Sequence, residues 1–298
     1  MASSAAGSGG RFEPVNEPQT QQKPGLEKQM KPQSESTKLE SEGHFVEYTG
    51  SNKLKDKNVL ITGGDSGIGR SVAVLMAREG ANITIVYLPE EEDDAKQTKN
   101  MVEQEKKPCL LIAGNLMDND TCKSAINQHI KKYSTLDVLV NNASKQIMCS
   151  DFADIDLDNV ESTFRSNILQ MFALTKYALP HMKKGSSIIN TTSVVAFRGT
   201  SSMIDYASTK AAIVGFTRSL AKNLTPKGIR VNAVAPGPVH TPIQPDTRPP
   251  EQMEGFGSQS MLGRPGQPSE VAPTFILLAS PEGALYCGQV LHPYPLGD

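Results

Sequence analysis

The sequence predicts an α/β fold with one doubly wound parallel sheet, Rossmann-like, that helices cover on both faces. The first observation is that short apolar runs alternate with longer amphipathic ones over most of the 298 residues, a pattern typical of βαβ units. The second is a glycine-rich loop, TGGDSGIG at 62–69, placed between a predicted strand and a predicted helix. The third is that Asn141 and Ser193 directly follow apolar runs, at the strand ends where such sheets bind ligands.

The elements follow in order from residue 58, where NVLIT is an apolar, β-rich run. After the glycine loop, Val72, Leu75 and Met76 recur with helical spacing. The helix expected at 118–132 begins at an acidic cap. The expected strands are 58–62, 82–88, 109–113, 136–141, 187–190, 229–235 and 289–291, and the further expected helices are 90–106, 118–132, 157–182, 205–224 and 269–279.

Two segments fall outside this alternation. Residues 1–50 are rich in Gln, Glu, Lys, Ser and Pro, so we expect a polar, largely disordered extension before a single domain over 51–298. Residues 1–38 are the expected free tail, whereas 44–54 can lie on the folded body. The Pro- and Gly-rich segment 236–263 predicts either a lid over a substrate or a surface excursion. We favour the lid because the segment follows the carboxyl end of a strand.

Composition excludes several classes of protein. The formal net charge is -2 and no long Lys/Arg cluster occurs, so we expect no nucleic-acid partner. No apolar run reaches the roughly 20 residues that span a bilayer, and the first 50 residues lack the apolar core of a secretory signal. The four cysteines are scattered and no His/Cys/carboxylate group has metal-ligand spacing. We therefore expect a cytoplasmic protein without a metal site.

Tyr206 and Lys210 are the leading candidates for chemistry. Their spacing of four residues places both side chains on one face of a helix. A nearby ammonium lowers the pKa of a phenol, so the pair can donate or accept a proton. Ser193, expected at a strand end, can hydrogen-bond a substrate oxygen beside the Tyr206 hydroxyl. Taken alone, the pair can equally be a chance juxtaposition on a surface helix.

Six motifs in order decide between these interpretations. They are TGGDSGIG at 62–69, NNA at 141–143, Asn167 in RSNILQMF, Ser193, YASTK at 206–210 and PGPVHT at 236–241. In this order the chain resembles a short-chain dehydrogenase/reductase over about 54–291. Within that superfamily, TGGDSGIGR, YLPEEEDDA and GRPGQPSEVAP look most like the general-stress oxidoreductase and plant glucose/ribitol dehydrogenase-like branch.

The resemblance implies a role for each matching residue. Tyr206 would be the acid/base, Ser193 would polarise the substrate oxygen, and Lys210 would lower the Tyr206 pKa and bind the nicotinamide ribose. Asn167 would hold a water in a proton relay to Lys210, or is simply a polar helix residue. The residues implied to bind the cofactor are Gly63, Asp65, Ser66, Gly67, Ile68, Gly69, Tyr87, Asn115, Asn142, Ala143, Tyr206, Lys210, Pro236, Gly237, Val239 and Thr241.

The choice of cofactor depends on the end of the second strand. NAD-specific members place a carboxylate there for the ribose 2′-OH, whereas this chain has Tyr87 followed by Leu88. No Arg or Lys stands there to attract a 2′-phosphate, and Asp65 adds negative charge. We expect NADP, with NAD as the alternative. Asn115 stands where family members usually carry an Asp near the adenine.

The predicted function is therefore an NAD(P)-dependent oxidoreductase that acts on a carbonyl or secondary alcohol. The alternative is a catalytically inactive dinucleotide-binding sensor or scaffold on the same fold. The substrate stays open between a sugar or polyol, an aldehyde and a secondary-metabolite carbonyl. Apolar residues on two helices predict a homodimer or homotetramer, as in the resembling enzymes; they are Ile168, Met171, Phe172, Leu174, Ile213 and Phe216.

Overall fold

Seven parallel strands in the order β11-β10-β9-β8-β5-β6-β7 form the centre of the computed structural model, which describes residues 7–294. Ile61 of β5 lies beside Ile85 of β6 on one side and Val140 of β8 on the other. The predicted fold class is confirmed. The strands are β5 (Asn58–Thr62), β6 (Asn82–Tyr87), β7 (Cys109–Ala113), β8 (Val138–Asn141), β9 (Ser187–Thr191), β10 (Arg230–Val234) and β11 (Val290–Leu291).

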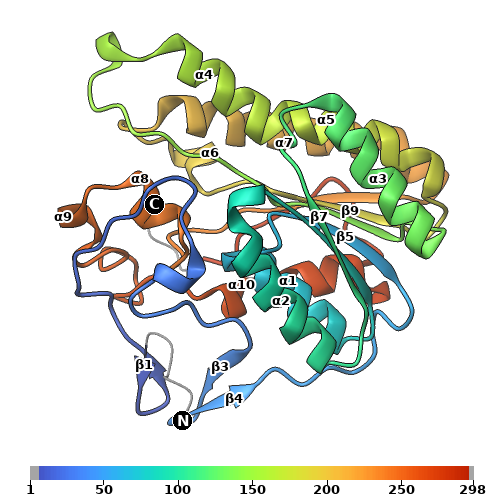
Figure 1. Cartoon of the computed structure of the whole chain (residues 1–298), viewed down its shortest axis with the longest axis horizontal. Helices are drawn as coiled ribbons and strands as arrows, with labels where there is room; N and C mark the ends of the chain where they lie inside the picture. Colours follow the sequence, from blue (N-terminus) through green and yellow to red (C-terminus); the bar gives the residue numbers. More distant parts are fainter. Residues whose placement is uncertain (1–6, 295–298) are drawn as a thin grey trace.

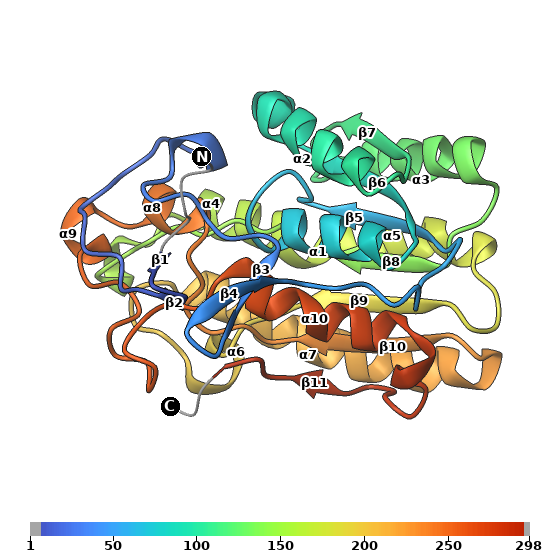
Figure 2. The ribbon, with the colours of Figure 1, turned by 90° about the horizontal axis from the view of Figure 1, so that it is seen from below.

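Helices cover both faces of this sheet (Figures 1 and 2). One layer holds α1 (Gly67–Arg78), α2 (Glu92–Gln104) and α10 (Pro268–Ala279), and the other holds α3 (Asn119–Tyr133), α4 (Leu157–Phe164), α5 (Gln170–Ala178) and α7 (Ile204–Leu224). Successive residues of β5 alternate between the layers, because strand side chains point to opposite faces. Val59 and Ile61 pack in the core that contains Phe275 of α10, and Leu60 packs in the core that contains Ile126 of α3.

The strand order reverses between β5 and β8. From β5 the chain proceeds to β6 and β7, and from β8 it proceeds through β9 and β10 to β11. Such a switch point opens a crevice at the carboxyl ends of the strands. There the backbone N–H of Asn142 donates to Oγ1 of Thr62 at 2.9 Å, which ties the segment after β8 to the end of β5.

Some elements differ from the expectation. The stretch 157–182 is not one α-helix, because a π-helical turn (Arg165–Leu169) separates α4 from α5 and a 3-10 turn (Leu179–His181) follows. The segment 236–263 contains two short helices, α8 (Ile243–Thr247) and α9 (Pro250–Met253). A four-residue helix, α6 (Val195–Arg198), follows β9. The other 3-10 turns are Glu27–Gln29, Pro89–Glu91, Phe152–Asp154, Thr225–Lys227 and Pro281–Gly283.

The N-terminal extension differs most from the expectation of disorder. From residue 7 it lies along the folded body and contains the antiparallel pairs β1–β2 (Gly7–Ser8, Arg11–Phe12) and β3–β4 (Lys38–Ser41, His44–Glu47). Its backbone is held by side chains of the body, such as Gln267, whose Oε1 accepts from Glu35 N at 3.0 Å. The composition did not reveal these long-range hydrogen bonds, which offset the ordering entropy. Residues 1–6 of the predicted tail lie outside the described residues, and the boundary at 50/51 stays a prediction.

Candidate active site

Tyr206 and Lys210 lie on successive turns of α7, and Ser193 follows the end of β9. The Lys210 Nζ is 5.3 Å from the centroid of the Tyr206 ring. Lys210 is 1% exposed and its Nζ donates to the Thr191 carbonyl at 3.0 Å. Oγ1 of Thr192 donates to the Lys210 carbonyl at 2.7 Å, so α7 and the end of β9 are joined at this point. The structure thus brings the three predicted residues to one place.

Burial sets the acidity of this pair. It raises the pKa of Tyr206 above its usual value, and hydrogen bonding by Gln146 and Ser193 only opposes that rise. Burial also lowers the pKa of Lys210 to about 7. Desolvation thus dominates at both groups, and the lowering of the Tyr206 pKa by Lys210 stays a prediction. A tyrosine in this state is protonated at neutral pH and is a proton donor.

Asn167 occupies the π-helical turn between α4 and α5, a type of distortion that is frequent at functional sites. Its Oδ1 accepts from Lys145 N at 2.7 Å, and its Nδ2 donates to the Lys145 carbonyl at 2.9 Å. The same Nδ2 donates to Thr209 Oγ1 on α7 at 3.1 Å. Asn167 therefore joins the segment after β8 to the helix that carries Tyr206 and Lys210.

The glycine loop is shaped for close backbone approach. A Cβ on Gly69 would lie 1.8 Å from the Gly63 carbonyl oxygen, so only glycine allows α1 to start this near to β5. Gly67, with φ +50°, is the first residue of α1. A Cβ there would lie 2.9 Å from Thr241 Cγ2, which places the segment after β10 beside the loop. The start of α1 also carries free N–H groups and the positive end of the helix dipole, which suit a phosphate.

One cavity of about 400 Å³ joins the glycine loop to Tyr206. Gly69 and Asn167 are not part of its wall. The predicted residues that line it are Gly63, Asp65, Ser66, Gly67, Ile68, Tyr87, Asn115, Asn142, Ala143, Ser193, Tyr206, Lys210, Pro236, Gly237, Val239 and Thr241.

Carboxylates gather at the end of the cavity next to β6. Asp65 is 1% exposed, and its Oδ2 has no hydrogen-bond partner among residues 7–294. Burial raises the pKa of Asp65, and burial together with the Asp65 charge raises the pKa of Glu91 to about 8. The Tyr87 hydroxyl is already engaged, because it donates a hydrogen bond to Glu92. Asp65 was predicted as a site residue from the sequence, whereas Glu91 was not.

The site also contains residues that the sequence analysis missed. Gln146 lines the cavity beside Tyr206, and its Oε1 is buried without a partner within the described chain. Its position three residues after the NNA motif was the available signal, since polar residues after a strand end face the crevice. Arg248 in the 236–263 segment opposes the rise in the Tyr206 pKa through its charge. Lys23 in the N-terminal extension also lines the cavity, and no sequence pattern indicated it.

The described residues 7–294 lack two kinds of feature. They contain no helix that is long and apolar enough to cross a membrane. In the same range no three His, Cys, Asp or Glu side chains stand together as a metal site would require.

The chain is similar to known proteins over most of its length. A family model described as enoyl-(acyl carrier protein) reductase matches residues 63–293. General stress protein 39 of Bacillus subtilis is 48% identical over 92% of this chain and 93% of its own length. Glucose and ribitol dehydrogenase of Daucus carota is 43% identical over 96% and 97%. NADPH-dependent aldehyde reductase 1, chloroplastic, of Arabidopsis thaliana is 46% identical over 86% and 91%.

A solved structure matches at the level of the whole fold. The crystal structure of a short chain dehydrogenase from Burkholderia cenocepacia in complex with NADP has a TM-score of 0.75 and 29% sequence identity. The match covers 80% of this chain and 97% of that one. The predicted superfamily and its general-stress and plant branch are confirmed by these similarities.

Proposed function

The chain belongs to the short-chain dehydrogenase/reductase superfamily, and on that premise we propose that it is an NADP(H)-dependent oxidoreductase that reduces a carbonyl compound. The observation that carries the proposal is a single cavity with the glycine loop in one part of its wall and Ser193, Tyr206 and Lys210 in another. A phosphate-binding loop and a proton donor in one cavity are what hydride transfer to a carbonyl requires. The nicotinamide supplies the hydride when it is bound.

Four residues of the chain would bind the substrate oxygen and supply the proton. Ser193 and Tyr206 would both hydrogen-bond the substrate oxygen, and Tyr206 would deliver its proton as the oxygen gains charge. Its raised pKa supports the reductive direction, because the hydroxyl is protonated at neutral pH. Lys210, with a pKa of about 7, can become charged or neutral near physiological pH and can replace the proton on Tyr206. Asn167 would position the relay through Thr209 and the segment after β8.

The cofactor proposal rests on the residues at the end of β6 and on the relatives. Tyr87 stands where an NAD-specific protein has a carboxylate, and its hydroxyl is engaged by Glu92. The Arabidopsis relative is named as NADPH-dependent, and the Burkholderia structure holds NADP. We propose NADP with NAD as the alternative. The neighbouring Asp65 and Glu91 modulate this choice and provide a test of it.

The experiment that tests the proposal is a turnover assay with NADPH and a panel of aldehydes, ketones and reducing sugars. We expect oxidation of NADPH, followed by the loss of its absorbance, with at least one carbonyl. Calorimetry with NADPH is run in parallel. Binding without turnover on the whole panel would favour the inactive sensor or scaffold, and absence of binding would contradict both functions.

We further propose that the protein is a homodimer through α5 and α7. The apolar surface available for a dimer interface is smaller than the sequence predicted, because Ile168, Met171 and Ile213 are buried within the subunit. Phe172 remains 53% exposed and packs with Phe216 at a centroid distance of 4.4 Å. Light scattering at micromolar concentration should give twice the monomer mass, and Phe172→Asp should halve it. A monomeric wild type would contradict this proposal.

A further inference from the structure

A segment of the N-terminal extension, residues 19–36, passes over the cavity, and we call it the strap. Lys23, Pro24 and Gly25 of the strap line the cavity together with the glycine loop and Tyr206. The strap lies directly against the 236–263 segment, since a Cβ on Gly25 would be 2.3 Å from the Pro242 carbonyl oxygen. It is therefore a wall of the cavity and not a separate surface feature.

One side of the strap is fastened to α8. The Lys23 Nζ donates to Asp246 Oδ1 at 2.9 Å and to the Gln146 carbonyl at 2.7 Å. The backbone N–H of Gly25 donates to Asp246 Oδ2 at 3.0 Å. Gln146 and Gln244 line the cavity beneath, and each has a buried Oε1 without a partner in the described part of the chain. Unpaired buried acceptors in a cavity indicate a site that a polar ligand completes.

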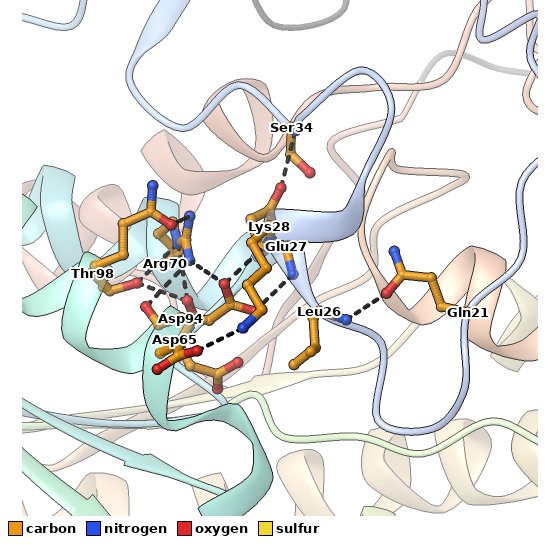
Figure 3. A network of polar contacts seen from close by, with 12 residues as sticks. Gln21, Leu26, Glu27, Lys28, Ser34, Asp65, Arg70, Asp94 and Thr98 are labelled. Atoms are coloured by element: carbon orange, nitrogen blue, oxygen red, sulfur yellow. Dashed lines mark hydrogen bonds and ion pairs between the residues drawn. The ribbon is translucent and has the colours of Figure 1, made fainter.

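The other side is fastened to the start of α1 by Glu27, which accepts from the Gly67 N–H. Figure 3 shows Glu27 together with Ser34, Asp94 and Arg70. Glu27 is 2% exposed; its Oε2 accepts from Gly67 N at 2.9 Å and its Oε1 accepts from Ser34 N at 3.0 Å. Asp94 of α2 accepts from Glu27 N at 2.7 Å and pairs with Arg70 of α1 at 3.5 Å. The network of Figure 3 thus joins the strap, α1 and α2 into one unit.

The Glu27 carboxylate accepts a hydrogen bond from the Gly67 N–H without being part of the cavity wall. Gly67 lines the cavity, whereas Glu27 does not. The carboxylate therefore satisfies one free N–H at the helix start without occupying the space of a ligand. The remaining N–H groups of the first turn stay available to a phosphate. We interpret Glu27 as an anchor and not as a competitor for the phosphate position, because its side chain is not part of the cavity wall.

We propose that the strap is a wall of the dinucleotide site and that Glu27 is a positioning residue, which holds the strap and the glycine loop together around the pyrophosphate. The inference rests on the proposed function, because it assumes that a dinucleotide occupies the cavity. Release of the cofactor then requires the strap to detach from Gly67 or from Asp246. Loss of the anchor weakens cofactor retention more than it weakens the chemical step.

The variant Glu27→Gln tests the anchor with little change in shape. The carboxylate accepts from two backbone N–H groups, whereas an amide has one acceptor oxygen and so loses one of them. We expect the dissociation rate of NADPH, followed by stopped-flow fluorescence, and the KM for NADPH to rise about tenfold, the effect of one charge-assisted hydrogen bond. We expect kcat at saturating NADPH to stay within about twofold, since Ser193 and Tyr206 are untouched. The matched control is Glu17→Gln, an exposed residue of the same extension, which should behave as wild type.

Limited proteolysis supplies a second measurement. If Glu27 had only a structural role, the protection that NADPH gives against cleavage would be the same in the wild type and in Glu27→Gln. Lys28 is the only lysine or arginine between Arg11 and Lys38 that proline does not follow. We expect saturating NADPH to slow tryptic cleavage after Lys28 in the wild type and to protect Glu27→Gln less.

Three outcomes would overturn the inference. Unchanged NADPH dissociation in Glu27→Gln would show that the anchor does not serve the cofactor, although the proposed function would stand. Tighter binding by Glu27→Gln would show that the carboxylate competes with the pyrophosphate. Failure of the wild type to bind either NADPH or NADH would overturn the proposed function and this inference together.

Discussion

The two ends of the cavity differ in charge and in the way that they are assembled. At the catalytic end, Tyr206 and Lys210 come from one helix and lie buried among hydrogen-bonding side chains. At the end next to β6, Asp65 of the glycine loop and Glu91 of the 3-10 turn after β6 bring like charges together. The first arrangement depends on a local spacing, and the second depends on how β5 and β6 pair. In the proposed enzyme, the groups for reaction chemistry and those for cofactor choice are therefore assembled by different means in one cavity.

The largest effect is expected at the catalytic end. Tyr206→Phe removes one oxygen and retains the ring, so turnover should fall by about 10²–10⁴-fold, as is typical of lost general acid–base catalysis. NADPH affinity should hold, because the glycine loop and Lys210 are intact. Steady-state kinetics and calorimetry check the two statements, with Tyr177→Phe on α5, outside the cavity wall, as the control. A Tyr206→Phe protein that keeps most of its turnover would rule out the mechanism.

Lys210→Met should produce a loss of similar size by another route. It removes the ammonium that replaces the proton on Tyr206, and it also removes the proposed ribose contact, so turnover and NADPH affinity should both fall. Combined with Tyr206→Phe, it should cost much less turnover than the product of the two single effects, since both residues serve one proton path. Fully multiplicative losses would mean that the two residues act independently.

A smaller effect is expected at the carboxylate end. Glu91 has a raised pKa of about 8, so it is neutral well below that pH and charged well above it. A charged Glu91 repels a 2′-phosphate, and the ratio of kcat/KM for NADPH to that for NADH should therefore fall as the pH rises through about 8. Glu91→Gln should flatten this dependence and favour NADPH by up to about tenfold at high pH, the effect of about 1.4 kcal/mol of repulsion.

The control for that experiment is Glu90→Gln, which changes an exposed neighbour. Glu90→Gln should retain most of the pH dependence of the NADPH-to-NADH ratio of kcat/KM. A preference that does not change with pH in the wild type would show that Glu91 does not face the ribose phosphate. A preference for NADH at every pH would instead contradict the choice of NADP.

The N-terminal extension shows where a composition argument fails. Its polar sequence indicates disorder, because it cannot bury enough apolar surface by itself. In the structure, Gln21, Glu27 and Glu35 engage partners more than thirty residues away. Each of these contacts exists only when the body is folded. A polar segment that is ordered by a preformed surface has the same composition as one that is free.

The sequence by itself determined the alternation of strands and helices, the glycine loop and the spacing of Tyr206 and Lys210. These features follow from residues that are neighbours along the chain, and their periodicity and spacing can be read directly. Only the tertiary structure decided the direction in which the Tyr206 pKa moves, the meeting of Asp65 with Glu91, and the anchoring of the strap at Gly67. The physical reason is that burial, charge repulsion and long-range hydrogen bonds depend on distances that arise only when β5, β6 and the extension pack together.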